Sequence, residues 1–402
     1  MTGVKIFAGE LQQYKTQLNS ELSRIMDYWI KNTPDELFGG FAGCIDEHEQ
    51  VVAGAPKGSV LNTRILWSFA AAYNLRKDSE YLKYAERAYR YIINHFIDRE
   101  YAGIYWTVDY EGNPLDTKKQ VYAIAFTIYG LSEYYIASGD EDAKMLAISL
   151  YSLLVDKSFD SKKTGYFEAF TREWQPIEDL RLSEKDANEQ KTMNTHLHVL
   201  EAYTNLYRIW QVGELKEQIV KLINNFLDHF IDPETNHLRL FFDENWHSKS
   251  TLVSYGHDIE ATWLLQEAAE VIADAVLLEK VKKINLKIAE ATIEGLDADG
   301  GLWYEYEPAD DHLIKQKHWW PQAEAMVGFF NAWQISNDDK YFDISLKNWD
   351  FVQKKILDLQ NGEWIWGVDE YGSPMPNEDK AGLWKCPYHN SRACIELIRR
   401  LS

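Results

Sequence analysis

Six short segments of the same character recur along the chain at nearly constant intervals. Each combines a turn residue with alternating aromatic or aliphatic residues, and polar turn sequences follow it, which is typical of short strands or hairpins. The segments begin at Gly39, Gly103, Gly165, His237, Gly301 and Gly362. The intervals between these starts are 64, 62, 72, 64 and 61 residues. Six repeats averaging 67 residues therefore account for the whole chain, and residues 1–402 are predicted to form a single domain.

Two helices fit between consecutive hairpins, and the sequence contains two kinds. In residues 81–96, 216–230 and 341–356, apolar residues recur at helical spacing while charged residues occupy the other face. These segments are predicted to be outer helices. Two of them end alike, in Asn-His-Phe-Ile-Asp at 94–98 and Asp-His-Phe-Ile-Asp at 228–232, which are 134 residues, or two periods, apart.

The second kind of helix is apolar around nearly its whole circumference, which indicates a buried helix. These segments are residues 61–75, 121–137, 195–210, 258–272, 322–335 and 390–401. Six buried helices that alternate with six amphipathic ones predict an all-α fold, the (α/α)6 barrel, with short hairpins at its mouth. An open helical solenoid is the alternative, but neither end of the chain has the polar cap that an open stack needs.

Composition and charge narrow the classes of partner. The 42 basic and 63 acidic residues give a net charge of −21, which disfavours nucleic acid and anionic membranes as partners. Three cysteines (Cys44, Cys386 and Cys394) without a CxxC pair indicate neither a disulfide framework nor a zinc site, and favour the cytoplasm. The first ten residues lack the apolar core of a signal peptide, and no run of eighteen apolar residues predicts a membrane span. Aromatic residues reach 14%, which suits both a core and a sugar-binding cleft.

In such a barrel the N-terminal ends of the inner helices meet at one mouth, so residues about sixty positions apart share a cavity. The candidates at these six ends are Arg64, Tyr122, Asn194, His198, His257, Glu260, Trp320, Glu324, Trp384 and His389. The tryptophans also fit simple packing. No spacing typical of metal ligands occurs, so no metal is predicted.

Helical geometry sorts the histidines of the third repeat. His196 and His198 lie two residues apart and point in roughly opposite directions, so only one can face the cavity. Asn194, His198 and Glu201 share one face, which makes His198 the inward residue.

The other candidates each have a structural alternative. His257 and Glu260 are three residues apart, which lets the carboxylate orient the imidazole or contact the same ligand. His389 precedes Asn390, which could cap the last inner helix. Arg64 lies in an otherwise apolar helix and needs an anionic partner, which could be Glu260, Glu324 or a substrate oxygen.

Several histidines and an arginine suit proton transfer next to a carbonyl, as at C2 of an aldose, where an arginine can stabilise the enediolate. A glycoside hydrolase would use two carboxylates instead, and Glu260 and Glu324 keep that alternative open. A sugar-binding barrel without catalytic activity is a third possibility.

At these residues the chain resembles the N-acylglucosamine 2-epimerase superfamily, most closely its cellobiose 2-epimerase branch. The motifs that carry the resemblance are Asn62-Thr63-Arg64, residues 194–203 (NTHLHVLEAY), 255–260 (YGHDIE), 319–324 (WWPQAE) and 384–390 (WKCPYHN). The resemblance implies an (α/α)6 barrel that epimerises C2 of the reducing glucose of β-1,4-linked disaccharides, such as cellobiose and lactose, reversibly and without a cofactor. Relatives that act on mannose or N-acylglucosamine, and aldose–ketose isomerases, share parts of the pattern.

The resemblance also implies roles for the candidate residues. His257 and His389 would be the acid/base pair, with His198 assisting. Arg64, Tyr122, Asn194, Glu260 and Glu324 would hold the sugar, and Trp320 and Trp384 would contact the disaccharide. The order of proton transfer, the balance of epimerisation and isomerisation, and the oligomeric state stay open.

Overall fold

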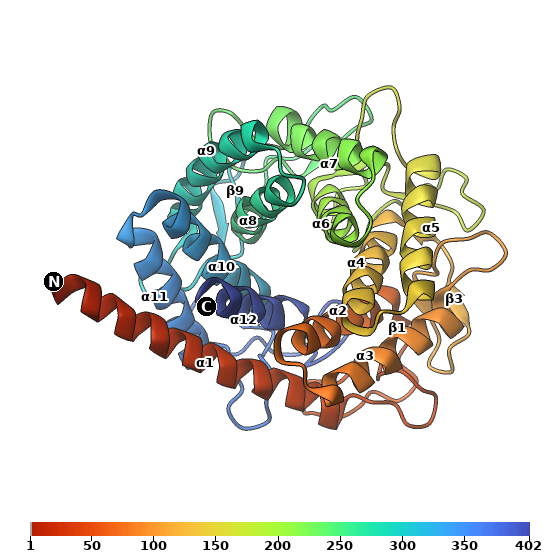
Figure 1. The fold of residues 1–402 in the computed structure, drawn as a ribbon, viewed down its shortest axis with the longest axis horizontal. Helices are drawn as coiled ribbons and strands as arrows, with labels where there is room; N and C mark the ends of the chain where they lie inside the picture. Colours follow the sequence, from red (N-terminus) through yellow and green to blue (C-terminus); the bar gives the residue numbers. More distant parts are fainter. Residues whose placement is uncertain (1) are drawn as a thin grey trace.

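Long helices form two concentric rings in the computed structural model (Figure 1), which describes residues 2–402, with side chains from residue 9 onward. The inner ring contains α2 (Ser59–Arg76), α4 (Val121–Ser138), α6 (Met193–Ile209), α8 (Tyr255–Val271), α10 (Trp319–Ser336) and α12 (Tyr388–Arg400). The outer ring contains α1 (Thr2–Asn32), α3 (Ser79–Tyr91), α5 (Glu141–Lys157), α7 (Gly213–Asn225), α9 (Ala275–Thr292) and α11 (Asp339–Lys355). The (α/α)6 prediction is confirmed. Met1, the first residue of the predicted 1–402 domain, lies outside the described residues.

The inner ring is closed. Each inner helix contacts the next one along the chain, and α12 contacts α2, so the last repeat returns to the first. The outer helix α1 packs against α12 and covers the junction. An open solenoid is therefore excluded. No helix in the described chain is long and apolar enough to cross a membrane.

Inner helices are buried on all sides because both rings pack against them. In α4 every residue from Val121 to Tyr134 is buried. Gly130 lets α4 approach α2 closely, since a Cβ at this position would lie 2.8 Å from the carbonyl oxygen of Thr63. Outer helices bury one face only, as the charge pattern predicts. The two segments with matching ends both finish in a π-helical turn, η1 (Ile92–Phe96) and η2 (Phe226–Phe230), which confirms the register of the repeat.

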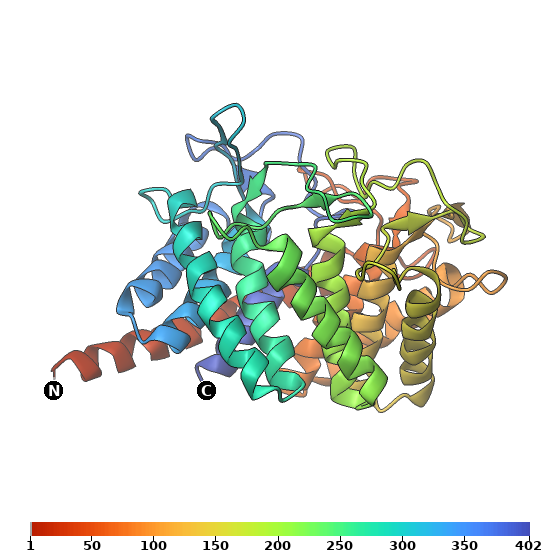
Figure 2. The ribbon, with the colours of Figure 1, turned by 90° about the horizontal axis from the view of Figure 1, so that it is seen from above.

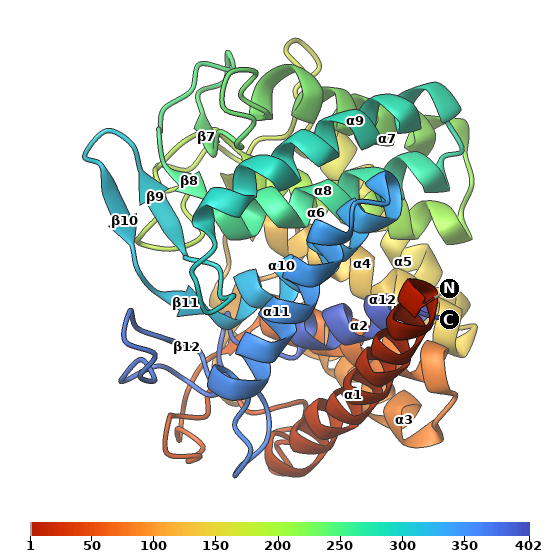
Figure 3. The same cartoon turned by 90° about the vertical axis from the view of Figure 1, so that its left-hand side faces the viewer.

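Short strands cluster at one end of the barrel, away from both termini (Figures 2 and 3). They are β1 (Lys57–Gly58), β2 (Thr107–Val108), β3 (Pro114–Asp116), β4 (Lys119–Gln120), β5 (Ala169–Phe170), β6 (Lys191–Thr192), β7 (Phe241–Phe242), β8 (Val253–Ser254), β9 (Glu305–Glu307), β10 (His312–Ile314), β11 (Lys317–His318) and β12 (Gly367–Val368). Five of the strands lead directly into an inner helix, and each pairs antiparallel with a strand of the next repeat. This pairing links neighbouring repeats and fixes the inner-helix N-termini around a common mouth.

The long third interval has a structural cause. Residues 171–190 connect β5 to β6, and this loop is ten residues longer than the corresponding loop 243–252 between β7 and β8. The additional residues lie over the mouth of the barrel.

Buried ion pairs fasten the strands to the outer helices. The first residue of β1, β4, β6 and β11 is a buried lysine whose Nζ lies 2.6–2.8 Å from an aspartate that follows an outer helix. The pairs are Lys57–Asp35, Lys119–Asp98, Lys191–Asp160 and Lys317–Asp297. A buried lysine requires such a partner, so the pairs hold each strand in a defined position.

Candidate active site

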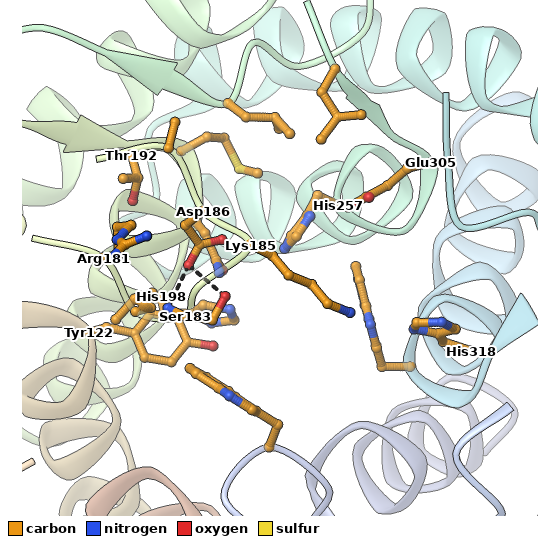
Figure 4. Close-up of a pocket in the computed structure, with 18 of the residues that line it drawn as sticks. Tyr122, Arg181, Ser183, Lys185, Asp186, Thr192, His198, His257, Glu305 and His318 are labelled. Carbon is orange, nitrogen blue, oxygen red and sulfur yellow. Dashed lines mark hydrogen bonds between the residues drawn. The ribbon is translucent and has the colours of Figure 1, made fainter. Parts of the chain in front are cut away.

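A cavity of about 520 Å³ opens at the strand end of the barrel, within the ring of inner-helix N-termini (Figure 4). Nine of the ten candidate residues line it. They are Arg64, Tyr122, Asn194, His198, His257, Glu260, Trp320, Trp384 and His389. The tenth, Glu324, lies behind the wall, where it bonds to His389 and to the indole of Trp263.

His389 lies in the first turn of α12 and is held from behind by Glu324. Its Nδ1 lies 2.7 Å from Glu324 Oε1. Burial, followed by the charges of Arg64 and Arg392, holds the pKa of His389 well below its ordinary value. The predicted cap is wrong: the helix begins after Pro387, and the Asn390 side chain donates to Glu363 instead. A lowered pKa favours the neutral imidazole, and a neutral imidazole oriented by a carboxylate suits a general base.

His257 lies in the first turn of α8 and has a different partner from the predicted one. Its Nδ1 lies 2.8 Å from the hydroxyl of Ser254, whereas Glu260 turns towards Arg392. Burial, and then the charge of His198, lowers the pKa of His257 to about 3. The ring centres of His257 and His389 lie 4.7 and 5.7 Å from that of Trp320, so both histidines contact the same indole.

His196 and His198 face opposite sides of α6, as predicted. His198 lines the cavity and its Nδ1 lies 2.9 Å from Glu201 Oε2. His196 points away: one ring nitrogen contacts the Thr192 carbonyl at 2.7 Å and the other accepts the Tyr166 N–H at 2.8 Å. His196 therefore has a structural role.

Arg64 contacts aromatic rings and a hydroxyl rather than a carboxylate. Its Nη2 donates to the Tyr122 hydroxyl at 2.6 Å, and its guanidinium lies over Phe126 and Tyr388 at 4.2 and 4.7 Å from the ring centres. Its Nε is buried without a hydrogen-bond partner among residues 2–402. Neither Glu260 nor Glu324 neutralises this arginine, so its charge remains available to an anionic oxygen in the cavity.

The arginine that pairs with the carboxylates is Arg392, which sequence reasoning did not assign. Its Nη1 donates to Glu201, and its Nη2 donates to Glu260 at 2.5 Å and to Glu324 at 2.7 Å. The available indication was its position three residues after His389 in a buried helix. Burial and the charge of Glu324 raise the pKa of Glu260 to about 7, so near neutrality this carboxyl group can also act as a hydrogen-bond donor.

Residues 180–187 of the loop 171–190 form part of the cavity wall. Ser183, Lys185 and Asp186 lie at its opening, and Lys185 reaches across towards the wall that carries Glu305 and His318 (Figure 4). Ser183 is bonded to Asp186 by its backbone and hydroxyl. Sequence reasoning did not assign these residues, although the interval of 72 residues marked the insertion.

Glu260, Glu324 and His389 also satisfy a simple distance criterion for a metal site, since a potential ligand atom of each lies within 4.8 Å of the others. Arg392 donates to both carboxylates and compensates part of their charge. This donor set fits an ion-pair network, and the predicted absence of a metal stays a prediction.

The closed barrel and its aromatic cavity, which contains several oriented histidines, are typical of (α/α)6-barrel enzymes that act on carbohydrates. The N-acylglucosamine 2-epimerase (GlcNAc 2-epimerase) family matches residues 39–393. A cellobiose 2-epimerase of Bacteroides fragilis is 50% identical over 385 residues, which cover 96% of this chain and 98% of that protein. The chain belongs to the N-acylglucosamine 2-epimerase family.

Further relatives agree over the full length. A cellobiose 2-epimerase of Dictyoglomus turgidum is 39% identical, with 98% of this chain and 100% of that protein covered. The solved structure of cellobiose 2-epimerase from Bacillus thermoamylovorans superposes with a TM-score of 0.92 at 40% identity, covering 97% of this chain and 100% of that chain. The resemblance seen in the motifs is thereby confirmed for the whole chain.

Proposed function

We propose that this protein is a cellobiose 2-epimerase, which interconverts glucose and mannose at the reducing end of β-1,4-linked disaccharides such as cellobiose and lactose. The observation that carries the proposal is the pair His257 and His389, two imidazoles with lowered pKa values on the wall of one cavity. The 50% identity to a cellobiose 2-epimerase supports the choice of substrate.

The chemistry has four steps: ring opening, removal of the C2 proton, rotation about the C2–C3 bond, and return of a proton to the opposite face of C2. A neutral histidine serves as the base that takes the C2 proton. The enediolate oxygen carries the charge that develops, and Arg64 is the cation available to stabilise it. The histidine that takes the C2 proton becomes an imidazolium, and the negative charge of the enediolate stabilises that form. The proton then returns to C2 from this imidazolium, directly or after exchange with water.

The partners of the two histidines suit these roles. The Glu324 carboxylate at 2.7 Å stabilises a positive charge on His389, while the Ser254 hydroxyl orients His257 without adding charge. His198, held by Glu201, lies on the same cavity. These differences favour His389 as the residue that holds the proton between its removal and its return.

The outer part of the cavity supports a disaccharide rather than a single sugar. Beyond the histidines, the wall continues with Trp384 and with residues 180–187 of the long loop. Trp384 offers an apolar face, which suits the C–H face of a pyranose ring. The volume of about 520 Å³ lies within the usual range for small-molecule sites.

A hydrolase is disfavoured by the position of the carboxylates. Glycosidases need two carboxyl groups that flank the scissile bond. Here the same nitrogen of Arg392 donates to Glu260 and Glu324, and Glu324 does not line the cavity. Of the two carboxyl groups expected for a hydrolase, Glu260 lines the cavity but is paired with Arg392, and Glu324 lies behind the wall.

The test is incubation of the purified protein in D2O with cellobiose, lactose, mannose and N-acetylglucosamine, without added metal or nucleotide. We expect the C2 epimer of cellobiose, with deuterium at C2 by NMR and mass spectrometry. Release of glucose, loss of activity with a chelator and its return with zinc, or no product from any sugar would contradict the proposal. Absence of C2 deuterium after many turnovers, in residual substrate as well as product, would contradict the enediolate.

A further inference from the structure

Arg392 is completely enclosed beneath the floor of the cavity. The side chain of Arg392 is 1% exposed, and Arg392 is not among the residues that line the cavity. The rings of Tyr388 and Trp263 pack against the guanidinium group of Arg392, with ring centres 4.2 and 4.7 Å from the guanidinium carbon. A charged group at such a position is costly unless it is paired, so its partners define what it does.

Those partners come from three different inner helices. Glu201 lies on α6, Glu260 on α8 and Glu324 on α10, while Arg392 itself lies on α12. One nitrogen of the guanidinium contacts Glu201, and another contacts both Glu260 and Glu324. The planar fork of an arginine can reach separate carboxylates in this way, whereas the single ammonium of a lysine cannot reproduce the geometry.

Two of the three carboxylates are the partners of cavity histidines. Glu201 holds His198 at 2.9 Å, and Glu324 holds His389 at 2.7 Å. A continuous chain of hydrogen bonds therefore runs from His198 through Glu201, Arg392 and Glu324 to His389. Within residues 2–402, Arg392 is the residue common to both carboxylate–histidine pairs.

We infer that Arg392 is a positioning residue for the reaction: it clamps Glu201 and Glu324 in place and thereby aligns His198 and His389 with the substrate. The inference rests on the proposed epimerase function and adds a residue that never touches the sugar. The third contact, to Glu260, extends the same clamp to a carboxyl group on the cavity wall.

The charge of Arg392 has a separate, measurable effect. Charged and titratable groups of five inner helices surround this cluster. They are Arg64 on α2, His198 and Glu201 on α6, His257 and Glu260 on α8, Glu324 on α10, and His389 and Arg392 on α12. Burial raises the pKa of Glu324 and Arg392 lowers it, while burial, Arg64 and Arg392 all lower the pKa of His389. Removal of Arg392 therefore raises both pKa values, and the acid limb of kcat/KM moves to higher pH.

Three variants separate alignment from charge. Arg392→Gln removes both the fork and the charge, and Arg392→Lys keeps the charge alone. Arg400→Gln is the matched control, because Arg400 lies on the same helix but does not line the cavity, and its partners are Asn331, Gln334 and Glu396. Folding is checked by circular dichroism and thermal unfolding, and kcat, KM and the pH profile are measured with cellobiose.

We expect Arg392→Gln to lower kcat/KM by about 100-fold or more, which is the lower end of what a positioned acid or base contributes. The acid limb of its kcat/KM profile should move to higher pH by about one unit, which is the effect of one nearby charge. Arg392→Lys should lose about tenfold in kcat with the acid limb unmoved. Arg400→Gln should match the wild type.

Arg392→Gln within about fivefold of wild-type activity would overturn the inference. So would equal losses in Arg392→Gln and Arg392→Lys with neither acid limb displaced, since that result indicates packing alone. If Arg392→Gln does not fold, Arg392→Lys decides: wild-type kcat refutes the need for the fork, and a loss with an unmoved limb supports it. Failure of the proposed function is distinct, because the wild-type protein would then show no epimerisation.

Discussion

His196 provides a direct test of how a buried histidine limits stability. Its ring is fully buried and bonded on both sides, with Nδ1 against the Thr192 carbonyl and Nε2 against the Tyr166 N–H. The carbonyl needs a donor and the N–H needs an acceptor, so the ring is the neutral tautomer with its hydrogen on Nδ1. A second proton would have to lie on Nε2, opposite the Tyr166 N–H. Burial accordingly lowers the pKa of His196 from 6.5 to about 3.

The barrel itself indicates the substitution that isolates this effect. The equivalent position, the fourth residue of an inner helix, is Gln322 in α10. Its side chain accepts the Leu302 N–H at 2.7 Å and donates to the carbonyl of His318, four residues earlier. Glutamine thus makes both bonds that His196 makes, without a titrating group. His196→Gln should therefore fold with nearly wild-type stability at pH 7.5.

The lowered pKa of His196 sets the direction in which the free energy of unfolding changes with pH. The unfolded chain binds a proton on His196 below pH 6.5, whereas the folded protein does not bind one until about pH 3. The contribution of the neutral His196 to the free energy of unfolding is therefore complete above pH 6.5 and is lost as the pH falls from 6.5 towards 3. The loss is about 1.4 kcal/mol per pH unit, or about 2 kcal/mol at pH 5. His196→Gln removes this contribution, so the variant should exceed the wild type by about 2 kcal/mol at pH 5.

Urea unfolding at pH 7.5, 6, 5 and 4.5 measures the difference between the two proteins, and other titrating groups cancel in it. His312→Gln is the control, because His312 is exposed and its substitution should leave the difference unchanged. Parallel stability curves for wild type and His196→Gln would refute the reasoning, since they would show that His196 binds its proton equally in both states.

Three further outcomes are expected. His257→Asn and His389→Asn should each lower kcat by about two to four orders of magnitude with folding intact, and a variant with near wild-type turnover would show that the residue is structural. Ser254→Ala should lower kcat by about tenfold with little change in KM, because it frees the His257 ring without removing it; an unchanged kcat would contradict this. Lys385→Met should reduce the free energy of unfolding by about 3–5 kcal/mol, since it removes the cation that is paired with the buried carboxylate of Glu363; a loss below about 1 kcal/mol by urea unfolding would show that the neutral donors to Glu363 suffice.

The architecture and most of the cavity wall could be predicted from local features of the amino-acid sequence. The interval of about 67 residues and the contrast between helices apolar all round and on one face are written into each repeat, so the two rings follow from local periodicity. Helix starts are also local, which is why residues 60 or more positions apart, such as Arg64, His257 and His389, could be assigned to one cavity. The relative orientation of His196 and His198 follows from helical geometry alone.

The pairing of the charged side chains could not be predicted from the sequence and is seen in the folded barrel. Sequence spacing placed Glu260 with His257 and offered Glu260 or Glu324 to Arg64, whereas the folded barrel gives both carboxylates to Arg392. The folded barrel also closes the ring through α12 and α2 and brings residues 180–187 to the cavity wall. The physical reason is that these contacts join helices far apart in the chain, and a buried charge takes the partner that the complete packing brings within reach, which no local pattern records.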